Sequence, residues 1–177
     1  SHGSGGRSMN SKLAHLDSET KVSESPHAHK DELRLWLRLL TCTNLVEASI
    51  RKRLAEQFDI TLPRFDLLAQ LERAPKGMTL GDLSRRMMVT NGNVTGLVER
   101  LVQAGYIKRF SLPNDRRVQI VKLTAKGQAS FNRIACAHEG WIAEFFAQLS
   151  PKDIDGLIQS LGKLKDSVKS INGAPEP

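Results

Sequence analysis

Cysteine and aromatic residues are both scarce in this chain, which has 2 cysteines and 1 tyrosine among its 177 residues. Cys42 and Cys136 lie far apart in the sequence and form no CxxC pair. This spacing argues against a disulfide framework and against a structural zinc site, and it is typical of a protein of the reducing cytoplasm. We therefore expect a cytoplasmic protein without a bound metal.

Long apolar runs and the common nucleotide-binding motifs are also missing. No apolar stretch approaches the roughly 20 residues that a membrane span requires, and neither a P-loop nor a GxGxxG motif occurs. Only Cys42, Cys136 and His138 within the predicted folded region could serve as nucleophile or base, and nothing beside them resembles an oxyanion loop. The sequence therefore predicts neither an enzyme nor a cofactor-binding protein, and no membrane partner.

The composition is otherwise that of an ordinary globular chain, with 40% hydrophobic and 25% charged residues. Its length suits one domain with a core, or two small lobes that share one. The residues SHGSGGRS before Met9 read as an expression scar. We assign residues 1–30 to this scar and to a polar, disordered arm.

The net charge of +7 is concentrated in one quarter of the chain. Three acids lie between Gly81 and Lys126, so nine bases minus three acids give +6 for this segment. The nine bases are Arg85, Arg86, Arg100, Lys108, Arg109, Arg116, Arg117, Lys122 and Lys126. A polyanion is the first partner to expect, because neutralising phosphates releases counterions. A solvated basic surface is the alternative.

Apolar spacing of three and four predicts a helix from Asp31 to Phe58. A second helix follows, with Pro63 in its first turn, and "APKG" ends it. In "MTLGDLSRRM", Thr79 is the expected N-cap of a third helix, with Asp82 three residues on. These segments indicate a mainly helical protein.

The stretch "TNGNVTGLVERLVQA" predicts a fourth helix, capped by Thr90 and ended by a left-handed Gly105. Together with the preceding helix it forms a helix-turn-helix pattern. Such a motif places the first turns of its second helix in the DNA major groove, where Asn can contact adenine. Gly92 and Gly96 would permit close approach, either of DNA or of a neighbouring helix. The alternative is an ordinary capped surface helix.

A basic hairpin follows directly and favours the nucleic-acid interpretation. "YIKRF" and "VQIVKL" read as strands, and "SLPNDRR" reads as the turn between them. Pro113, Asn114 and Asp115 fix this turn, and Asp115 is expected to hold an arginine by ion pairing. An arginine-rich hairpin tip can enter the narrow minor groove.

Two further helices complete the fold class, which is mainly α with a small β-hairpin wing. Thr124 caps a helix that we expect to run to about Leu149. Ser150, Pro151 and Asp153 form a cap for the last helix, which should run to about Ile171. The predicted order is four helices, a hairpin and two helices.

Two motifs resemble the MarR (multiple antibiotic resistance regulator) family of winged-helix regulators. The first, within Leu80 through Arg109, contains "LVxRLxxAGYIxR" at residues 97–109, and the second is "DRRxxxVxLTxxG" from Asp115 to Gly127. The resemblance covers about Asp31 to Ser170. It implies a homodimer held by a helical region at 31–58 and 124–171, with a winged helix-turn-helix DNA-binding lobe at 59–123.

The family implies binding to a palindromic operator in double-stranded DNA, most often as a repressor. By position in the motif, Arg117 matches the wing arginine of the minor groove. The predicted DNA-binding residues are Arg85, Arg86, Thr90, Asn91, Asn93, Thr95, Asn114, Asp115, Arg116 and Arg117.

The resemblance also implies a small aromatic carboxylate effector, bound between the dimer helices and the winged lobe. The branch that regulates hydroxycinnamate or benzoate catabolism is the most similar, and some of its members sense the aromatic acyl-CoA thioester. Arg34, Arg38, Arg51, Lys52 and Arg53 would supply cations for the phosphates of CoA. The predicted ligand-binding residues are Arg34, Trp36, Arg38, Asn44, Arg64, Phe65, Leu68, His138 and Trp141, with Leu40 as a further apolar candidate.

A thiol-based oxidant sensor is the alternative within the family. Cys42 lies in the first helix, near the place where such sensors carry their cysteine. Those sensors hold the thiolate with nearby tyrosines, however, and Tyr106 is the sole tyrosine here.

Overall fold

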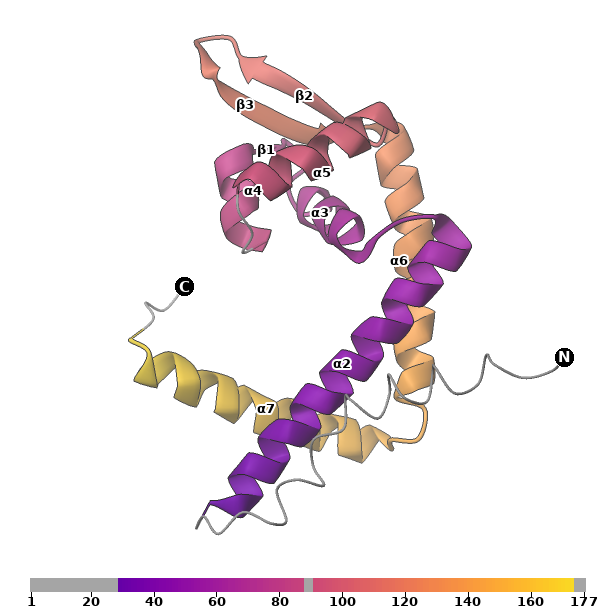
Figure 1. The fold of residues 1–177 in the computed structure, drawn as a ribbon, viewed down its shortest axis with the longest axis vertical. Coiled ribbons are helices and arrows are strands. Elements are labelled where there is room, and N and C mark those ends of the chain that lie inside the picture. The colour runs from indigo at the N-terminus through magenta and orange to yellow at the C-terminus, as the bar shows by residue number, and fades with distance from the viewer. Residues whose placement is uncertain (1–28, 88–90, 174–177) are drawn as a thin grey trace, which may run out of the picture. The chain divides into compact units, whose positions relative to one another are not determined.

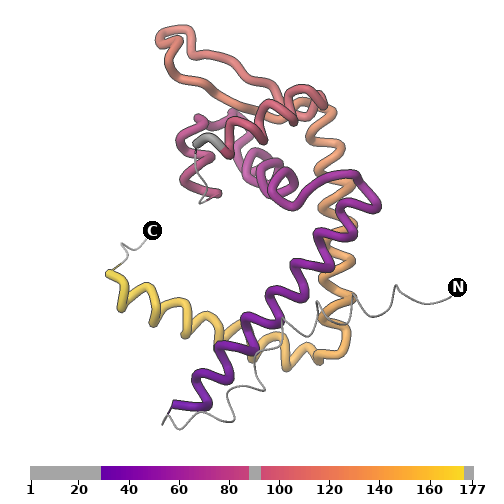
Figure 2. Tube along the Cα trace, in the orientation of Figure 1, coloured from indigo at the N-terminus to yellow at the C-terminus, as the bar shows by residue number. Residues whose placement is uncertain are grey.

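The computed structural model describes residues 29–87 and 91–173. The chain divides into two compact units, residues 1–138 and residues 139–177. The described elements run in the order α2, α3, β1, α4, α5, β2, β3, α6 and α7 (Figures 1 and 2). This confirms the predicted fold class: a mainly helical chain with a small antiparallel sheet.

Helix α2 spans Lys30–Phe58 and confirms the predicted first helix. Only Ile50 and Leu54 are buried on it, so its N-terminal half leaves large apolar side chains exposed. The helix ends at Asp59, which takes the left-handed conformation at φ 50° and donates its backbone N–H to the Ala55 carbonyl. The core of the first unit therefore begins at the C-terminal end of α2.

Helix α3 spans Leu62–Glu72, and its first turn contains Pro63 as predicted. Thr61 caps it, since the Thr61 Oγ1 accepts the backbone N–H of Arg64 at 3.4 Å. Four apolar residues of α3 are buried in the core: Phe65, Leu67, Leu68 and Leu71.

Helices α4 (Leu80–Met87) and α5 (Asn91–Gln103) form the predicted helix-turn-helix pair. The expected cap of α4 is present, because the backbone N–H of Asp82 donates to Thr79 Oγ1 at 3.0 Å. The predicted cap of α5, Thr90, lies outside the described residues. Helix α5 buries one face at Val94, Val98 and Leu101, none of which is more than 1% exposed.

A three-stranded antiparallel sheet forms in the order β1-β3-β2, from β1 (Met78–Thr79), β2 (Ile107–Leu112) and β3 (Asp115–Leu123). The sequence predicted only the two hairpin strands, because a strand of two residues shows no alternation. Gly77 precedes β1 at φ 89°, and a Cβ there would lie 2.7 Å from the Val121 carbonyl oxygen. Glycine thus allows β1 to pair closely with β3.

Helix α6 spans Ala125–Phe145, and it ends four residues before the predicted end near Leu149. Residues 146–149 instead form a turn, in which the backbone N–H of Leu149 donates to the Phe146 carbonyl at 3.0 Å. At its start, Thr124 Oγ1 accepts the backbone N–H of Gly127 at 3.0 Å, which confirms the predicted cap. Gly127 is required there, since a Cβ would lie 1.8 Å from the Tyr106 carbonyl oxygen.

Helix α7 spans Pro151–Ile171 in the second unit. Its predicted cap is a full capping box, because the side chains of Ser150 and Asp153 each accept the other's backbone N–H at 3.1 Å. The single chain buries no residue of α7, although the helix is amphipathic. Among the described residues, no helix is both long and apolar enough to cross a membrane.

Candidate nucleic-acid interface

Helix α5 has an outer face that is open to solvent. Asn93, Gly96 and Arg100 are exposed at helical spacing, while Thr95 is half-buried. A Cβ on Gly96 would meet nothing within 4 Å, so no other part of the described chain needs this glycine. Glycine weakens a helix interior by about 0.8–1 kcal/mol relative to alanine, and it leaves this part of α5 without a side chain. Asn91 is the first residue of α5.

Helix α4 carries two exposed arginines, Arg85 and Arg86, in its last turn. Arg85 forms an ion pair with Asp82 one turn earlier. Both side chains of this pair are largely solvated, and a pair of that kind contributes little to stability. The positive charge of this turn is therefore available at the surface next to α5.

The hairpin projects beyond α5 as a long two-stranded ribbon (Figure 1). Its strands continue farther than predicted, and Pro113 and Asn114 alone make the turn. Arg116 and Arg117 consequently lie in β3 and not in the turn where the sequence placed them. The prediction was wrong at this boundary because the polar composition of "SLPNDRR" was taken for an extended loop.

The register of the hairpin changes near its tip. Ser111 pairs with Gln119, whereas the next residue on β2, Leu112, pairs with Asp115. One step on β2 thus corresponds to four steps on β3, which leaves three residues of β3 without a partner on β2. We call these residues, Arg116 to Val118, the tip bulge. A bulge bends its strand and redirects its side chains, and here both tip arginines lie in the bulge and are exposed.

Two side chains bind the backbone of the tip bulge. Asp115 Oδ1 accepts the backbone N–H of Arg117 at 3.0 Å. From the other end, Gln119 Nε2 donates to the Arg116 carbonyl at 3.4 Å. We expected an ion pair between the Asp115 carboxylate and an arginine guanidinium. In the structure the carboxylate instead contacts the backbone N–H of Arg117.

Gln119 also connects the two strands of the wing. Its Nε2 donates to Ser111 Oγ at 2.7 Å, and its Oε1 accepts the Nε–H of Arg109 at 3.0 Å. Sequence reasoning counted Arg109 only as part of the basic segment and did not single out Gln119. The contact between Arg109 and Gln119 depends on the register of β2 against β3, which the alternation of residues in the strands did not determine.

The predicted ligand-binding residues fall into separate places in the chain. Arg34, Trp36 and Arg38 lie on the exposed N-terminal half of α2, and Arg34 is 3.8 Å from Asp31. Trp36 precedes Phe58 by 22 residues, or about 33 Å of helix at roughly 1.5 Å per residue. Within one chain these three residues therefore do not join those on α3.

The remaining predicted ligand residues are mostly core. Phe65 is buried, with its ring centroid 5.8 Å from that of Phe131 and 5.2 Å from that of His138. Leu68 is fully buried, Asn44 on α2 is half-buried, and Trp141 on α6 is buried in the second unit. None of these packing contacts by itself requires a ligand.

Polar groups with unusual surroundings lie near this aromatic cluster. The Arg64 Nε is buried, and among the described residues it has no hydrogen-bond partner. Partial burial raises the pKa of Asp66 above its ordinary 3.8, and the Glu47 carboxylate raises it further, while His138 and Arg51 act in the opposite direction. Arg64 thus retains an unused donor on α3.

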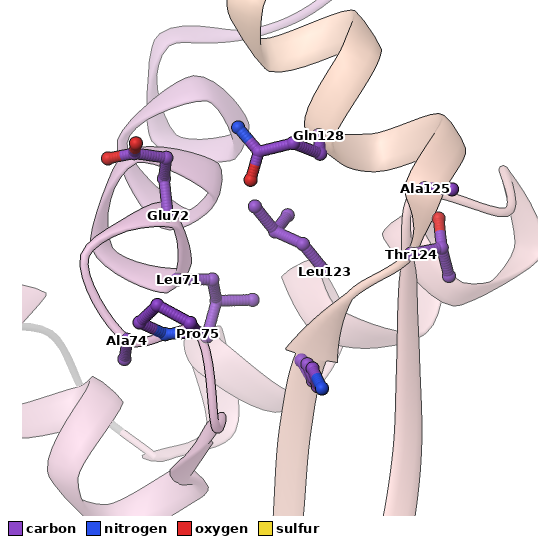
Figure 3. Close-up of a pocket in the computed structure, with 9 residues that line it drawn as sticks. Leu71, Glu72, Ala74, Pro75, Leu123, Thr124, Ala125 and Gln128 are labelled. Atoms are coloured by element: carbon purple, nitrogen blue, oxygen red, sulfur yellow. The ribbon is translucent and has the colours of Figure 1, made fainter.

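A hollow of about 220 Å³ lies between the end of α3 and the start of α6 (Figure 3). Leu71 and Leu123 line it, and Gln128 points its amide across it. None of the predicted ligand residues lines this hollow. Its volume is below the roughly 300–1,000 Å³ of typical ligand pockets.

The two thiols, Cys42 and Cys136, are free and exposed. Tyr106, the sole tyrosine, lies in the winged lobe with the Lys126 Nζ 5.2 Å from its ring centroid. No observation joins this tyrosine to Cys42.

The helix pair with an adjoining basic hairpin defines a winged helix-turn-helix protein of the DNA-binding class. A family model described as the MarR family matches residues 60–118. A MarR family transcriptional regulator from Silicibacter pomeroyi, known by crystal structure, is 32% identical with a TM-score of 0.68, over 81% of this chain and 99% of that one. The chain belongs to the MarR family of DNA-binding transcriptional regulators.

Two further relatives extend the comparison. The transcriptional activatory protein BadR of Rhodopseudomonas palustris is 28% identical over 142 residues, which cover 78% of this chain and 81% of BadR. A MarR family regulator of Streptomyces coelicolor, solved in complex with DNA, has a TM-score of 0.71 at 22% identity over 86% of this chain and 94% of that one. At this identity the second likeness supports the fold alone.

The open face at Gly96 gives a prediction in which stability and binding move in opposite directions. Gly96→Leu should stabilise α5 by about 0.5–1 kcal/mol, because leucine favours a helix. The added side chain should obstruct close approach of DNA at a cost of about 1–3 kcal/mol, or roughly 5- to 150-fold in affinity. Thermal unfolding and fluorescence anisotropy measure the two effects. Gly96→Ala serves as the small-side-chain comparison, and unchanged binding by the leucine variant would place the groove contact elsewhere.

Proposed function

We propose that this protein is a homodimeric, ligand-responsive repressor that binds a palindromic operator and leaves it when an aromatic acid or its CoA thioester binds. The observation that carries the DNA-binding part is the pairing of an open α5 face with a wing tip whose arginines are exposed in a bulge. Asn93 on α5 is suited to base edges of the major groove. Arg116 and Arg117 are suited to phosphates or to the minor groove.

Further residues extend the proposed contact to the DNA backbone. Arg85 and Arg86 lie exposed at the end of α4, where they can contact phosphates beside the α5 groove. Asn114 lies exposed in the wing turn, and Thr95 lies half-buried on α5. The same role remains a prediction for Thr90, outside the described residues, and for Asn91, at the start of α5.

The homodimer is supported by apolar side chains that one chain leaves uncovered. On α7, Leu157, Leu161, Leu164 and Val168 form a stripe at helical spacing, and each is 41–46% exposed. On α2, Leu35 and Trp36 are more than half exposed. An exposed apolar stripe such as the one on α7 marks an interface. A second copy of the chain is the proposed occupant, because a palindromic operator requires two recognition helices related by a two-fold axis.

Replacing one residue of the stripe should separate the subunits. Leu161→Lys places a charge in the proposed interface and should give a monomer in sedimentation velocity experiments at micromolar concentration. Gln159→Lys adds the same charge at an exposed position on the opposite side of α7 and should leave the dimer intact. A wild-type chain that sediments as a monomer would remove this part of the proposal.

Arg117→Ala should weaken operator binding, because it removes a proposed DNA contact from the tip bulge. If Arg117 contacts a phosphate, the slope of log affinity against log salt should fall by about one contact. If it enters the minor groove, the preference for A·T pairs near the edges of the site should relax as well. Arg133→Ala removes the same charge from an exposed position on α6 and is the matched control. Equal losses in both variants would show a general charge effect without a wing contact.

The effector part of the proposal rests on the surroundings of α3. The buried Arg64 Nε offers an unused donor for an anion, and Phe65, Phe131 and His138 supply aromatic surface nearby. The basic first helix, including Arg34, Arg38 and Arg51, supplies cations of the kind that CoA phosphates require. A role in ligand binding stays a prediction for Trp36, Asn44, Leu68 and Trp141.

Effector binding should weaken DNA binding and, by linkage, operator DNA should weaken effector binding by the same factor. A ligand shifts an equilibrium only by its difference in affinity between two states. A coupling of about 1–3 kcal/mol corresponds to roughly 5- to 150-fold. Calorimetric titration of a hydroxycinnamoyl-CoA and of the free acid, each with and without operator DNA, measures this factor.

Two controls sharpen the effector experiment. Arg64→Met keeps most of the side-chain volume but removes the donor, and should weaken binding of the anionic ligand without changing operator affinity. Equal ligand affinity with and without DNA would exclude the tested compound as effector. Because BadR is named an activatory protein, a promoter–reporter assay is needed to tell repression from activation of transcription. Reporter expression that falls when the gene is deleted contradicts repression.

A further inference from the structure

The tip bulge of the wing consists of three residues that have no Cα partner in the register of the strand ladder. Arg116, Arg117 and Val118 have no partner on β2, because Ser111 pairs with Gln119 and Leu112 with Asp115. Backbone that has no strand partner at an exposed tip ordinarily forms hydrogen bonds with water and samples several conformations. Arginines on such a segment would lose conformational entropy on binding DNA.

Gln119 contacts the tip bulge and both strands at once. Its carboxamide oxygen accepts the Arg109 Nε–H, and its nitrogen donates to Ser111 Oγ across the hairpin. The same nitrogen makes the longer, 3.4 Å contact with the Arg116 carbonyl. A carboxamide is suited to this place because it combines an acceptor with two N–H donors.

Asp115 completes the arrangement from the opposite end of the bulge, where it accepts the Arg117 N–H at 3.0 Å. Residues on either side of the bulge therefore bind one backbone donor and one backbone acceptor within it. The Arg109 guanidinium donates to Gln119 through its Nε–H.

We propose that Gln119 is a positioning residue for DNA recognition: it fixes the tip bulge and Arg109 so that three arginines of the wing meet the DNA backbone or minor groove in a preformed arrangement. This inference rests on the proposed function of the wing. Gln119 itself needs no contact with DNA. It acts by lowering the ordering cost that Arg109, Arg116 and Arg117 incur on binding.

The test is a double-mutant cycle on a duplex that the wild-type protein selects from a randomised library. Gln119→Ala should weaken binding roughly 2- to 12-fold, the range expected for the loss of one ordinary hydrogen bond. In the Arg117→Ala background the same change should have a clearly smaller effect, because one of the residues it positions is already absent. Gln119→Met keeps the length of the side chain without its hydrogen bonds and should behave like the alanine variant.

Two measurements separate positioning from folding. Amide hydrogen exchange at Arg117 should become faster in Gln119→Ala, while the melting temperature should stay close to that of the wild type. Gln128→Ala makes the same chemical change on α6, outside the wing, and should leave both exchange at Arg117 and DNA affinity unchanged.

Each other outcome overturns the inference in a recognisable way. Full binding by Gln119→Ala, with weak binding by Arg117→Ala, would refute positioning by Gln119 and keep the wing's proposed role. Full binding by both variants would refute the wing's role as well. Restored binding in Gln119→Met, or an undiminished effect in the Arg117→Ala background, would show that Gln119 acts by another route.

Discussion

The structure of the winged lobe depends on one junction, where Thr124 joins the end of β3 to the start of α6. The Thr124 hydroxyl donates to the Gly105 carbonyl at 2.6 Å and accepts the Gly127 N–H at 3.0 Å. Its backbone N–H donates to the Tyr106 carbonyl at 3.1 Å. A single residue thus binds the end of α5, the start of β2 and the first turn of α6, and a hydroxyl is needed because it donates and accepts together.

The neighbours of this junction leave little freedom for movement between the recognition helix and α6. Lys126 Nζ donates to the Ala104 carbonyl at 2.9 Å, where a cation also interacts favourably with the C-terminal end of α5. Gly127 lies directly against the Tyr106 backbone, with no room for a Cβ. Because of this tight packing and these shared hydrogen bonds, we expect α5, the wing and the first turns of α6 to move together. A small rotation of this lobe would shift the proposed major-groove and wing contacts at once.

Sequence reasoning succeeded where a local chemical rule decides the structure. The caps at Thr79, Thr124 and Ser150 and the positive φ at Gly105 follow from donors and acceptors within a few residues. It failed where the outcome depends on pairing between distant segments. The strand at Met78 is too short to show a pattern, and the tip bulge depends on the register of β3 against β2. Part of the candidate interface could thus be named from sequence, but the arrangement of Arg116 and Arg117 could not.

The predicted ligand-binding residues also depend on contacts between distant segments, which the sequence does not determine. Resemblance supplied residue types on α2, α3 and α6, but the length of α2 separates Trp36 from Phe65 by many helical turns within one chain. If an effector contacts both Trp36 and Phe65, the second copy of the chain must supply one of these two residues. The effector site would then depend on formation of the dimer. A ligand bound across two subunits would contact each winged lobe through the start of α3. It could then change the distance between the two recognition helices without touching either of them, because the Thr124 junction holds α5, the wing and the start of α6 together.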